Sequence, residues 1–172
     1  MTRYPRLLMA IHWLTAALIV FAWFSGDWRD AARHHSPEAI HGMAGLAVLA
    51  LFVPRLLVRL FGGTPADPPG TSRAMVIAAK AGHGLLYLFI IFLPLMGWYA
   101  GSLKGMDLQF FGLTVPPLAT MTDGKAGFIG DAHEVGGNVL MVLAGGHALM
   151  ALYHQYFLRD GTLMRMLPWG GK

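Results

Sequence analysis

The 172-residue sequence contains no cysteine and few charged residues. Without thiols the chain cannot form disulfide bonds, thiolate-ligated iron–sulfur clusters or the covalent C-x-x-C-H attachment of a prosthetic group. Charged residues make up 13% of the sequence and hydrophobic residues 55%, whereas soluble globular domains have about 25% and roughly 45–50%. This imbalance excludes an ordinary soluble core and indicates a membrane protein with several spans. The length suits one domain and is too short for two ordinary ones.

Four apolar runs are present, and each is long enough to cross roughly 30 Å of hydrocarbon as a helix. They extend over residues 7–25, 40–60, 74–99 and 132–157, with boundaries that are approximate. The sequence therefore predicts an all-α fold. We expect a transmembrane four-helix bundle that forms a single integral-membrane domain over residues 1–172.

Positive charges are distributed unevenly between the two sides of this predicted bundle. Nine of the thirteen Lys and Arg residues lie on the side that holds both termini, and the other side has only Arg29, Arg33, Lys104 and Lys125. Because cytoplasmic segments are enriched in Lys and Arg, we expect both termini in the cytoplasm. The lipid bilayer then accounts for the net charge of +4, and we expect no nucleic-acid partner.

Residues 131–156 are apolar enough for a span and yet contain three histidines. His133, His147 and His154 are 14 and 7 residues apart, which is close to whole numbers of helical turns. Ionisable residues inside a span are costly and are read as functional by default. Several glycines in the same stretch remove side-chain bulk beside these histidines. A flat, bulky ligand next to each of two histidines explains both facts, and haem is such a ligand.

The depth of each histidine in its span predicts two pairs. His41 and His133 open the second and fourth spans near the outer surface, and His12 and His147 lie at matching depth farther inside. Each pair would fill both axial positions of a haem iron and leave no open site for oxygen. The expected chemistry is therefore electron transfer between two non-covalently bound haem groups, with iron centres about 20 Å apart by the helix rise.

Other residues near these pairs allow two interpretations. Gly45 and Gly137, one turn below the outer histidines, could clear space for haem or permit close helix packing. Arg55 and Arg59 could bind haem propionates or extend to lipid phosphates. For His83 taken alone, a hydrogen-bonded packing role is favoured.

Seven segments of the sequence match a known family in combination. They are RLLMAIHWL (6–14), HGMAG (41–45), GHGLLYLFIIFLPLMG (82–97), FFGLTVPPL (110–118), HEVGGN (133–138), GGHAL (145–149) and HQYFLRDGTLMRMLP (154–168). Through them the chain resembles, nearly end to end, the bacterial cytochrome b561 family. The resemblance implies a small four-span protein of the bacterial inner membrane with two haem b groups. It also implies that the axial ligands of the iron are His12, His41, His133 and His147.

The resemblance further implies an activity. Some family members oxidise superoxide at the outer face and pass the electrons to ubiquinone, so an oxidoreductase with superoxide as donor and the ubiquinone pool as acceptor is expected. His154 corresponds to a family histidine associated with the quinone, and His83 could share that task. A capping or packing role stays open for both. The outer segments carry four Lys and Arg against seven Asp and Glu, so steering of the superoxide anion would need a local cluster of the basic residues.

Two other functions remain open from the sequence. The first is a haem b anchor that carries electrons for a partner dehydrogenase such as a hydrogenase, because cytochrome subunits of such complexes share the fold. The second is a metal transporter lined by His and Met without haem, which predicts no haem absorption.

Overall fold

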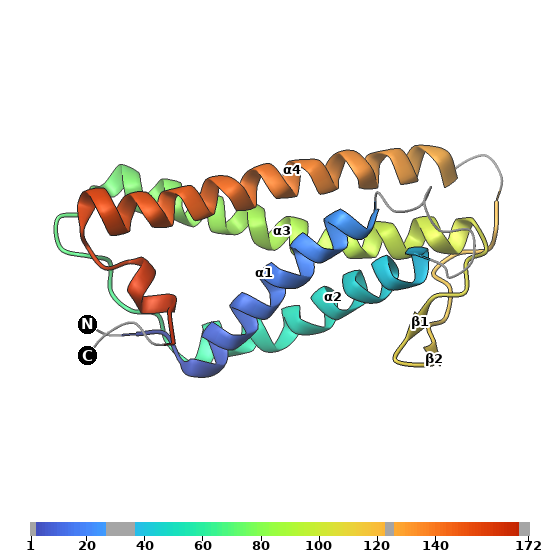
Figure 1. Ribbon diagram of the computed structural model, residues 1–172, viewed down its shortest axis with the longest axis horizontal. Coiled ribbons are helices and arrows are strands. Elements are labelled where there is room, and N and C mark those ends of the chain that lie inside the picture. The colour runs from blue at the N-terminus through green and yellow to red at the C-terminus, as the bar shows by residue number, and fades with distance from the viewer. Residues whose placement is uncertain (1–2, 27–36, 123–125, 169–172) are drawn as a thin grey trace.

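Four long helices make up most of the protein, which is seen here in a computed structural model that describes residues 3–26, 37–122 and 126–168. The helices are α1 (Arg6–Gly26), α2 (Pro37–Phe61), α3 (Arg73–Leu103) and α4 (Ala126–Tyr153). α1 packs mainly on α2, and α3 packs mainly on α4. All four run roughly along the long axis of the molecule (Figure 1), and each is long and apolar enough to cross a membrane. The predicted all-α, four-helix transmembrane bundle is confirmed.

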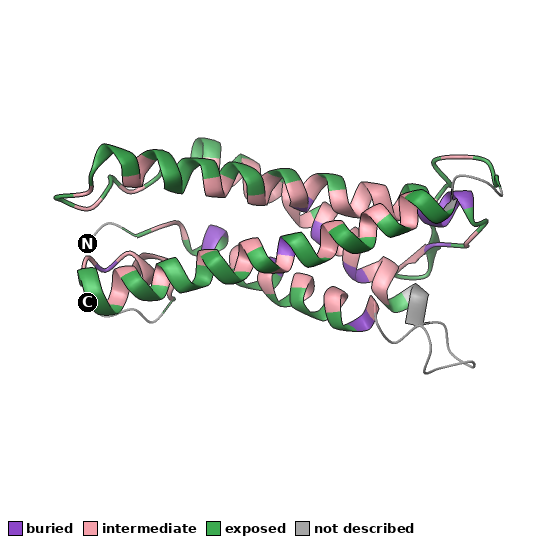
Figure 2. Cartoon of the chain, turned by 90° about the horizontal axis from the view of Figure 1, so that it is seen from above, coloured by how far each residue is buried: buried purple, intermediate pink, exposed green. Residues whose placement is uncertain are grey.

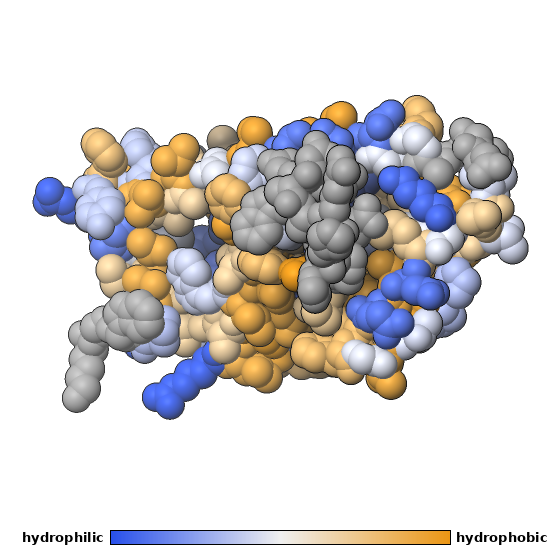
Figure 3. Space-filling view, turned by 45° about the vertical axis from the view of Figure 1, so that its right-hand side comes forward, coloured by the Kyte–Doolittle hydropathy of each residue, from blue (hydrophilic) through white to orange (hydrophobic). Residues whose placement is uncertain are grey.

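Much of the helical surface is exposed, as the green segments of Figure 2 show, and many of the exposed side chains are large and apolar. In the most apolar 18-residue stretch of each candidate span, only 6–22% is buried inside the protein. On the face seen in Figure 3, hydrophobic residues gather in the lower middle, and strongly hydrophilic residues lie along the upper edge and on both sides. Lipid tails solvate such a surface, and the helices satisfy their own backbone hydrogen bonds. The bundle therefore has a thin protein core and an outer surface suited to lipid.

The two ends of the bundle differ. The first and last described residues lie together at one end, the terminal end, and a β-hairpin lies at the other, the hairpin end (Figure 1). In the hairpin, β1 (Gln109–Phe110) pairs antiparallel with β2 (Leu113–Thr114). Phe111 and Gly112 form the turn with φ of 50° and 81°, as a two-residue hairpin loop requires. The first and last described residues thus lie on one side; that the termini face the cytoplasm remains a prediction.

Leu108 anchors the hairpin on the bundle. Its side chain is buried, and its Cδ2 atom lies 2.9 Å from the point that a Cβ on Gly42 would occupy. It also packs near Gly101, and its carbonyl accepts a hydrogen bond from the amide of Val115 at 2.9 Å. The absence of a side chain at Gly42 on α2 therefore lets Leu108 and the hairpin pack against this end of the bundle.

The segment after α4 crosses the terminal end. It consists of one π-helical turn, η2 (His154–Leu158), and a short 3-10 helix, η3 (Leu163–Met166). The carbonyl of Arg165 accepts a hydrogen bond from the amide of Tyr4 at 3.3 Å, and its Nη1 donates to the carbonyl of Ala66 at 2.6 Å. This segment thereby joins the start of the chain and the loop between α2 and α3 to the end of α4.

Candidate functional site

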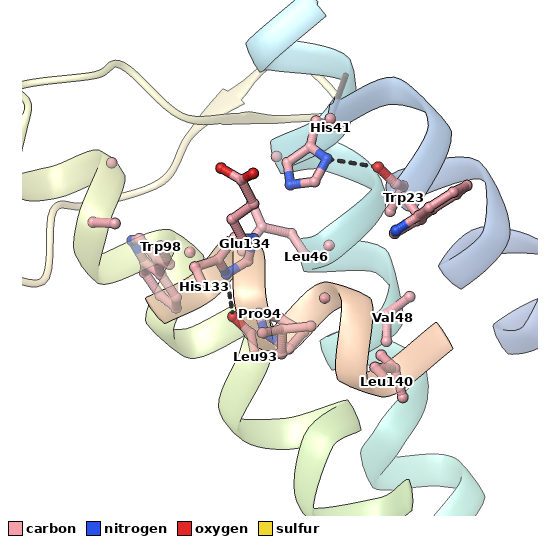
Figure 4. A pocket seen from close by; sticks show the side chains of 18 of the residues that line it. Trp23, His41, Leu46, Val48, Leu93, Pro94, Trp98, His133, Glu134 and Leu140 are labelled. Carbon is pink, nitrogen blue, oxygen red and sulfur yellow. Dashed lines mark hydrogen bonds between the residues drawn. The ribbon is translucent and has the colours of Figure 1, made fainter. Parts of the chain in front are cut away.

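His41 on α2 and His133 on α4 face each other at the hairpin end (Figure 4). Their ring centroids are 5.8 Å apart, with the ring planes at 83°. Two imidazoles on opposite sides of one metal ion, with metal–nitrogen bonds of about 2 Å, have centroids about 6 Å apart. The separation therefore fits an ion held between the two rings.

Backbone carbonyls fix the protonation pattern of both rings. Nδ1 of His41 donates to the carbonyl of Ala22 at 2.8 Å, and Nδ1 of His133 donates to the carbonyl of Leu93 at 3.1 Å (dashed lines in Figure 4). A carbonyl oxygen only accepts, so the proton of each neutral ring is on Nδ1. The lone pair of Nε2 is then available, which is the usual arrangement of a metal-binding histidine with its outer hydrogen bond.

A cavity of about 220 Å³ lies around this pair and is lined by residues of all four helices. Its volume is many times the roughly 10–15 Å³ that one water needs, so it has room for a larger ligand. Gly45 and Gly137 line it, and outside their own helices no protein atom lies within 4 Å of the point that a Cβ on either would occupy. Close helix packing does not explain these two glycines. They keep the cavity open, which is the space-clearing interpretation.

Charged side chains of both signs line the same cavity. Lys104 and Glu134 are both in its wall, and Figure 4 shows Glu134 beside the two histidines. Steering of superoxide would need a cluster of the four outer basic residues. Of these, Lys104 lies at the cavity, whereas Arg29, Arg33 and Lys125 lie outside the described residues.

Gly97 on α3 also shapes the site. A Cβ at this position would lie 2.7 Å from Cε1 of His133, so only glycine leaves room for the ring. A single glycine in an apolar run indicates that something approaches closely, but it does not say what. For this reason the sequence did not identify Gly97.

Three histidines gather nearer the terminal end. The ring of His147 lies 6.2 Å from that of His12 and 5.2 Å from that of His83. The separation of His12 and His147 again fits an ion between two rings, while His83 flanks His147. In the described part of the chain, no three His, Asp or Glu residues are arranged to hold a metal ion by themselves. Pairs of imidazoles supply only two ligands, so they suit the iron of haem, whose ring supplies the others.

Arg55 reaches into this second group. Its Nη2 lies 3.0 Å from Nδ1 of His12, and its Nε lies 3.3 Å from the hydroxyl of Tyr87. The guanidinium of Arg59 lies over the Tyr87 ring, 5.7 Å from its centroid. Both arginines are half-buried and turn into the bundle. Because an arginine only donates, Nδ1 of His12 is the acceptor and its neutral ring carries the proton on Nε2. Binding of iron through Nε2 would therefore require Arg55 to leave Nδ1.

His154 makes a contact with Asp160 that no helical pattern predicts. Its Nδ1 lies 2.5 Å from Oδ2 of Asp160, six residues later. Partial burial raises the pKa of the Asp160 carboxyl, but hydrogen bonds from His154 and Thr162 outweigh this effect and hold it below its usual value. Asp160 is therefore ionised at neutral pH. His83, which was considered with His154, lies instead beside His147.

The sequence is similar to known proteins over nearly its whole length. Residues 3–169 match the family described as prokaryotic cytochrome b561. The chain is 36% identical over 169 residues to the probable superoxide oxidase CybB of Yersinia pestis, a match that covers 96% of both chains. It is 31% identical to cytochrome b562 of Cereibacter sphaeroides, over 95% of this chain and 94% of that one. It is also 31% identical to cytochrome b561 homolog 2 of Escherichia coli K12, over 96% of this chain and 91% of that one.

Replacing Gly97 by alanine should destabilise the protein by about 1–3 kcal/mol, as overpacking typically does. The new methyl group would overlap the His133 ring, which the carbonyl of Leu93 holds in place. Gly84→Ala is a matched control, since it is on the same helix and has no neighbour within 4 Å of the new Cβ. Thermal unfolding in detergent, followed by circular dichroism, should show a lower midpoint for Gly97→Ala alone. Equal midpoints would mean that the His133 ring moves aside freely.

Proposed function

The chain belongs to the prokaryotic cytochrome b561 family and binds haem b, and from this premise we propose that it is a di-haem superoxide:ubiquinone oxidoreductase of the bacterial inner membrane. Two histidine pairs at different depths carry the proposal. His41 and His133 would hold one haem at the hairpin end, and His12 and His147 would hold the other nearer the terminal end. Haem b supplies reversible one-electron chemistry, and histidines on both faces of its iron leave no position for oxygen.

Helix α4 links the two sites. His133 and His147 are 14 residues apart on this continuous helix, which is about 21 Å along its axis. Two haems held by these residues would then lie at different depths of the bilayer. By the excess of Lys and Arg at the terminal end, that end would face the cytoplasm and the hairpin end the outside.

The reaction that we propose uses both ends. Superoxide is an anion that does not enter hydrocarbon readily, so it would be oxidised at the hairpin end, where Lys104 lies in the cavity wall. Ubiquinone is lipid-soluble and would be reduced at the terminal end. Two superoxide ions and two protons then convert one ubiquinone into ubiquinol and release two molecules of oxygen.

The residues of the terminal end would divide between haem and quinone. Arg55, which contacts His12, and Arg59, which lies over the Tyr87 ring, would bind the propionates of a haem held by His12 and His147. His154, beyond this pair and near the end of the span, would contact the quinone. For His83, a share in the quinone site and a packing role were both open from the sequence, and its position 5.2 Å from His147 favours a packing partner of that ring.

The alternatives are less well supported. Membership in a haem-binding family leaves the haem-free metal transporter without support. The anchor subunit of a dehydrogenase stays the main rival, and the full-length similarity to a probable superoxide oxidase favours the superoxide reaction over it.

Loss of one axial ligand should remove one haem and leave the other. His133→Ala should reduce the pyridine haemochrome stoichiometry from two haems per chain to one, because the partner His41 alone holds a haem weakly. His154→Ala is the control and should retain both. Two haems in His133→Ala, with an unchanged spectrum, would contradict the pairing of His41 with His133.

The activity is tested by mixing the detergent-purified protein with superoxide and following the haem absorbance. Reduction by superoxide, and reoxidation on adding a short-chain ubiquinone, is the expected result. Lys104→Gln should lower the second-order rate constant for superoxide several-fold and weaken its dependence on salt, since a cation near the cavity attracts the anion.

Lys80→Gln is the control for this experiment, because Lys80 is exposed on α3 toward the opposite end. It should react with superoxide as the wild type does. Two haems that superoxide does not reduce would contradict the proposal and favour the anchor subunit. Equal rate constants for Lys104→Gln and wild type would mean that superoxide is oxidised without electrostatic attraction by Lys104.

Arg55→Gln should lower the midpoint potential of one haem by roughly 30–60 mV, since about 59 mV corresponds to a tenfold change for one electron. The reason is that a nearby positive charge stabilises the reduced, less positive haem. Arg73→Gln, which changes an exposed residue at the start of α3, should leave both potentials unchanged. Spectroelectrochemical titration measures the two values. An unchanged pair of potentials in Arg55→Gln would exclude a propionate contact of Arg55.

A further inference from the structure

The end of α4 departs from regular helical geometry at His154. Residues His154–Leu158 form a π-helical turn, which is rare and is often found at functional sites. Arg159 then adopts the left-handed conformation with φ of 54°, and the chain reverses. The carbonyl of His154 accepts hydrogen bonds from the amides of both Arg159 and Asp160. This wide turn brings the Asp160 side chain back to the ring six residues earlier.

Both carboxylate oxygens of Asp160 are engaged. Oδ2 meets Nδ1 of His154 at 2.5 Å, and Oδ1 accepts a hydrogen bond from the amide of Thr162 at 2.9 Å. The second bond fixes the direction of the carboxylate, because the amide belongs to the backbone of the same tight turn. The Thr162 amide thus fixes the Asp160 carboxylate, and the carboxylate in turn fixes the ring of His154.

This contact determines which ring nitrogen of His154 can react. An ionised carboxylate only accepts hydrogen bonds, so Nδ1 of His154 carries a proton and donates it. Nε2 is then the nitrogen that remains for another partner. It accepts a hydrogen bond when the ring is neutral and donates one when the ring is protonated.

The surroundings of His154 suit a ligand that arrives from the bilayer. The Tyr153 ring meets the His154 ring edge-on at 6.4 Å and stacks on Phe157 at 5.3 Å. Tyr153 and Phe157 are 44% and 76% exposed, on a helix whose surface faces lipid. Exposed aromatic rings at the end of a span are typical of the membrane interface, where the head group of a lipid-soluble quinone would lie.

We propose that Asp160 is a positioning residue that fixes the tautomer and orientation of His154, so that Nε2 delivers protons to a carbonyl oxygen of the quinone. This proposal rests on the proposed reduction of ubiquinone. Each reduction of one quinone consumes two electrons and two protons. When the protonated ring gives its Nε2 proton to the quinone oxygen, the neutral ring keeps the proton on Nδ1, which is hydrogen-bonded to the Asp160 carboxylate. Nε2 then regains a proton from cytoplasmic water. A positioned acid or base of this kind contributes about 10²–10⁴-fold to a rate.

The test is Asp160→Asn, a change of nearly equal size. The Thr162 amide can only donate, so the single carbonyl oxygen of asparagine stays toward it and the NH2 group faces His154. Nδ1 of His154 then accepts a hydrogen bond, and the proton of the neutral ring moves to Nε2. Asp67→Asn, on the exposed loop between α2 and α3, is the control. The measurements are ¹⁵N NMR of labelled histidine, with His154 assigned by its loss in His154→Gln, and turnover with a short-chain ubiquinone.

The expected result is a change of His154 tautomer together with a fall in kcat of tenfold or more, at a nearly unchanged KM. Reduction by superoxide without quinone should stay as in wild type, and both haems should be retained. Asp160→Glu should recover part of the rate, since it keeps the carboxylate. A changed tautomer with wild-type kcat would overturn the proposal and make Asp160 merely a helix-end residue.

The spectrum of the wild-type protein tests the proposal even if Asp160→Asn does not fold. A His154 proton found on Nε2 in the wild type would overturn it directly. Failure of the proposed function looks different, because wild-type protein would then show the expected His154 tautomer and no turnover of the quinone.

Discussion

An imidazole inside an apolar bundle needs a hydrogen-bond acceptor for its N–H group. Here the acceptors are backbone carbonyls of neighbouring helices, so these hydrogen bonds connect the helices in pairs. His41 on α2 donates to the carbonyl of Ala22 on α1, and His133 on α4 donates to the carbonyl of Leu93 on α3. These bonds lie within the two helix pairs that pack most extensively, α1 with α2 and α3 with α4. The two rings then face each other across the boundary between the pairs. A haem between His41 and His133 would therefore join two halves that are each stabilised separately.

The two histidine pairs differ in their partners, and the difference has an electrostatic consequence. The pair at the hairpin end is held by neutral carbonyls, which leave Nε2 available to iron. At the terminal end the partner of His12 is the cation Arg55, with Arg59 close by over Tyr87. Positive charge beside a haem favours its reduced state. On the proposed function, electrons that enter at the hairpin end would be stabilised near the terminal end, which is the direction that reduction of quinone requires.

The sequence predicts those features that depend on length and depth. A span needs about 20 apolar residues whatever surrounds it, so the four helices follow from the apolar runs. A histidine's depth follows from its position within a run, and the structure accordingly brings His41 to His133 and His12 to His147. Rotation about the helix axis is set by packing, which a single sequence does not contain. That is why the approach of His83 to His147 was not predicted.

The glycines also show that contacts within one helix can be predicted from the sequence, whereas contacts between helices cannot. Gly45 and Gly137 were identified because each follows a histidine by one turn, a relation within one helix. Gly97 was not, because its neighbour His133 belongs to a different helix. The contact between His154 and Asp160 could not be predicted from the sequence for a related reason. Residues six apart point in different directions on an α-helix, and only the π turn and the left-handed Arg159 bring Asp160 to the ring.

The position of Asp160 is informative because it is electrostatically unfavourable by itself. A helix C-terminus carries a partial negative charge, so a carboxylate beside it costs about 0.3–1 kcal/mol, and glycine, lysine or arginine are the usual residues there. Partial burial also raises the pKa of Asp160, but the hydrogen bonds from His154 and Thr162 outweigh the burial and hold this pKa below its usual value. A helix that only had to stop could do so with Gly161 and its φ of 73°. The carboxylate adds what glycine cannot: one oxygen accepts from the Thr162 amide of the turn, and the other holds the His154 ring in one orientation, which is what a proton donor to a bound ligand requires.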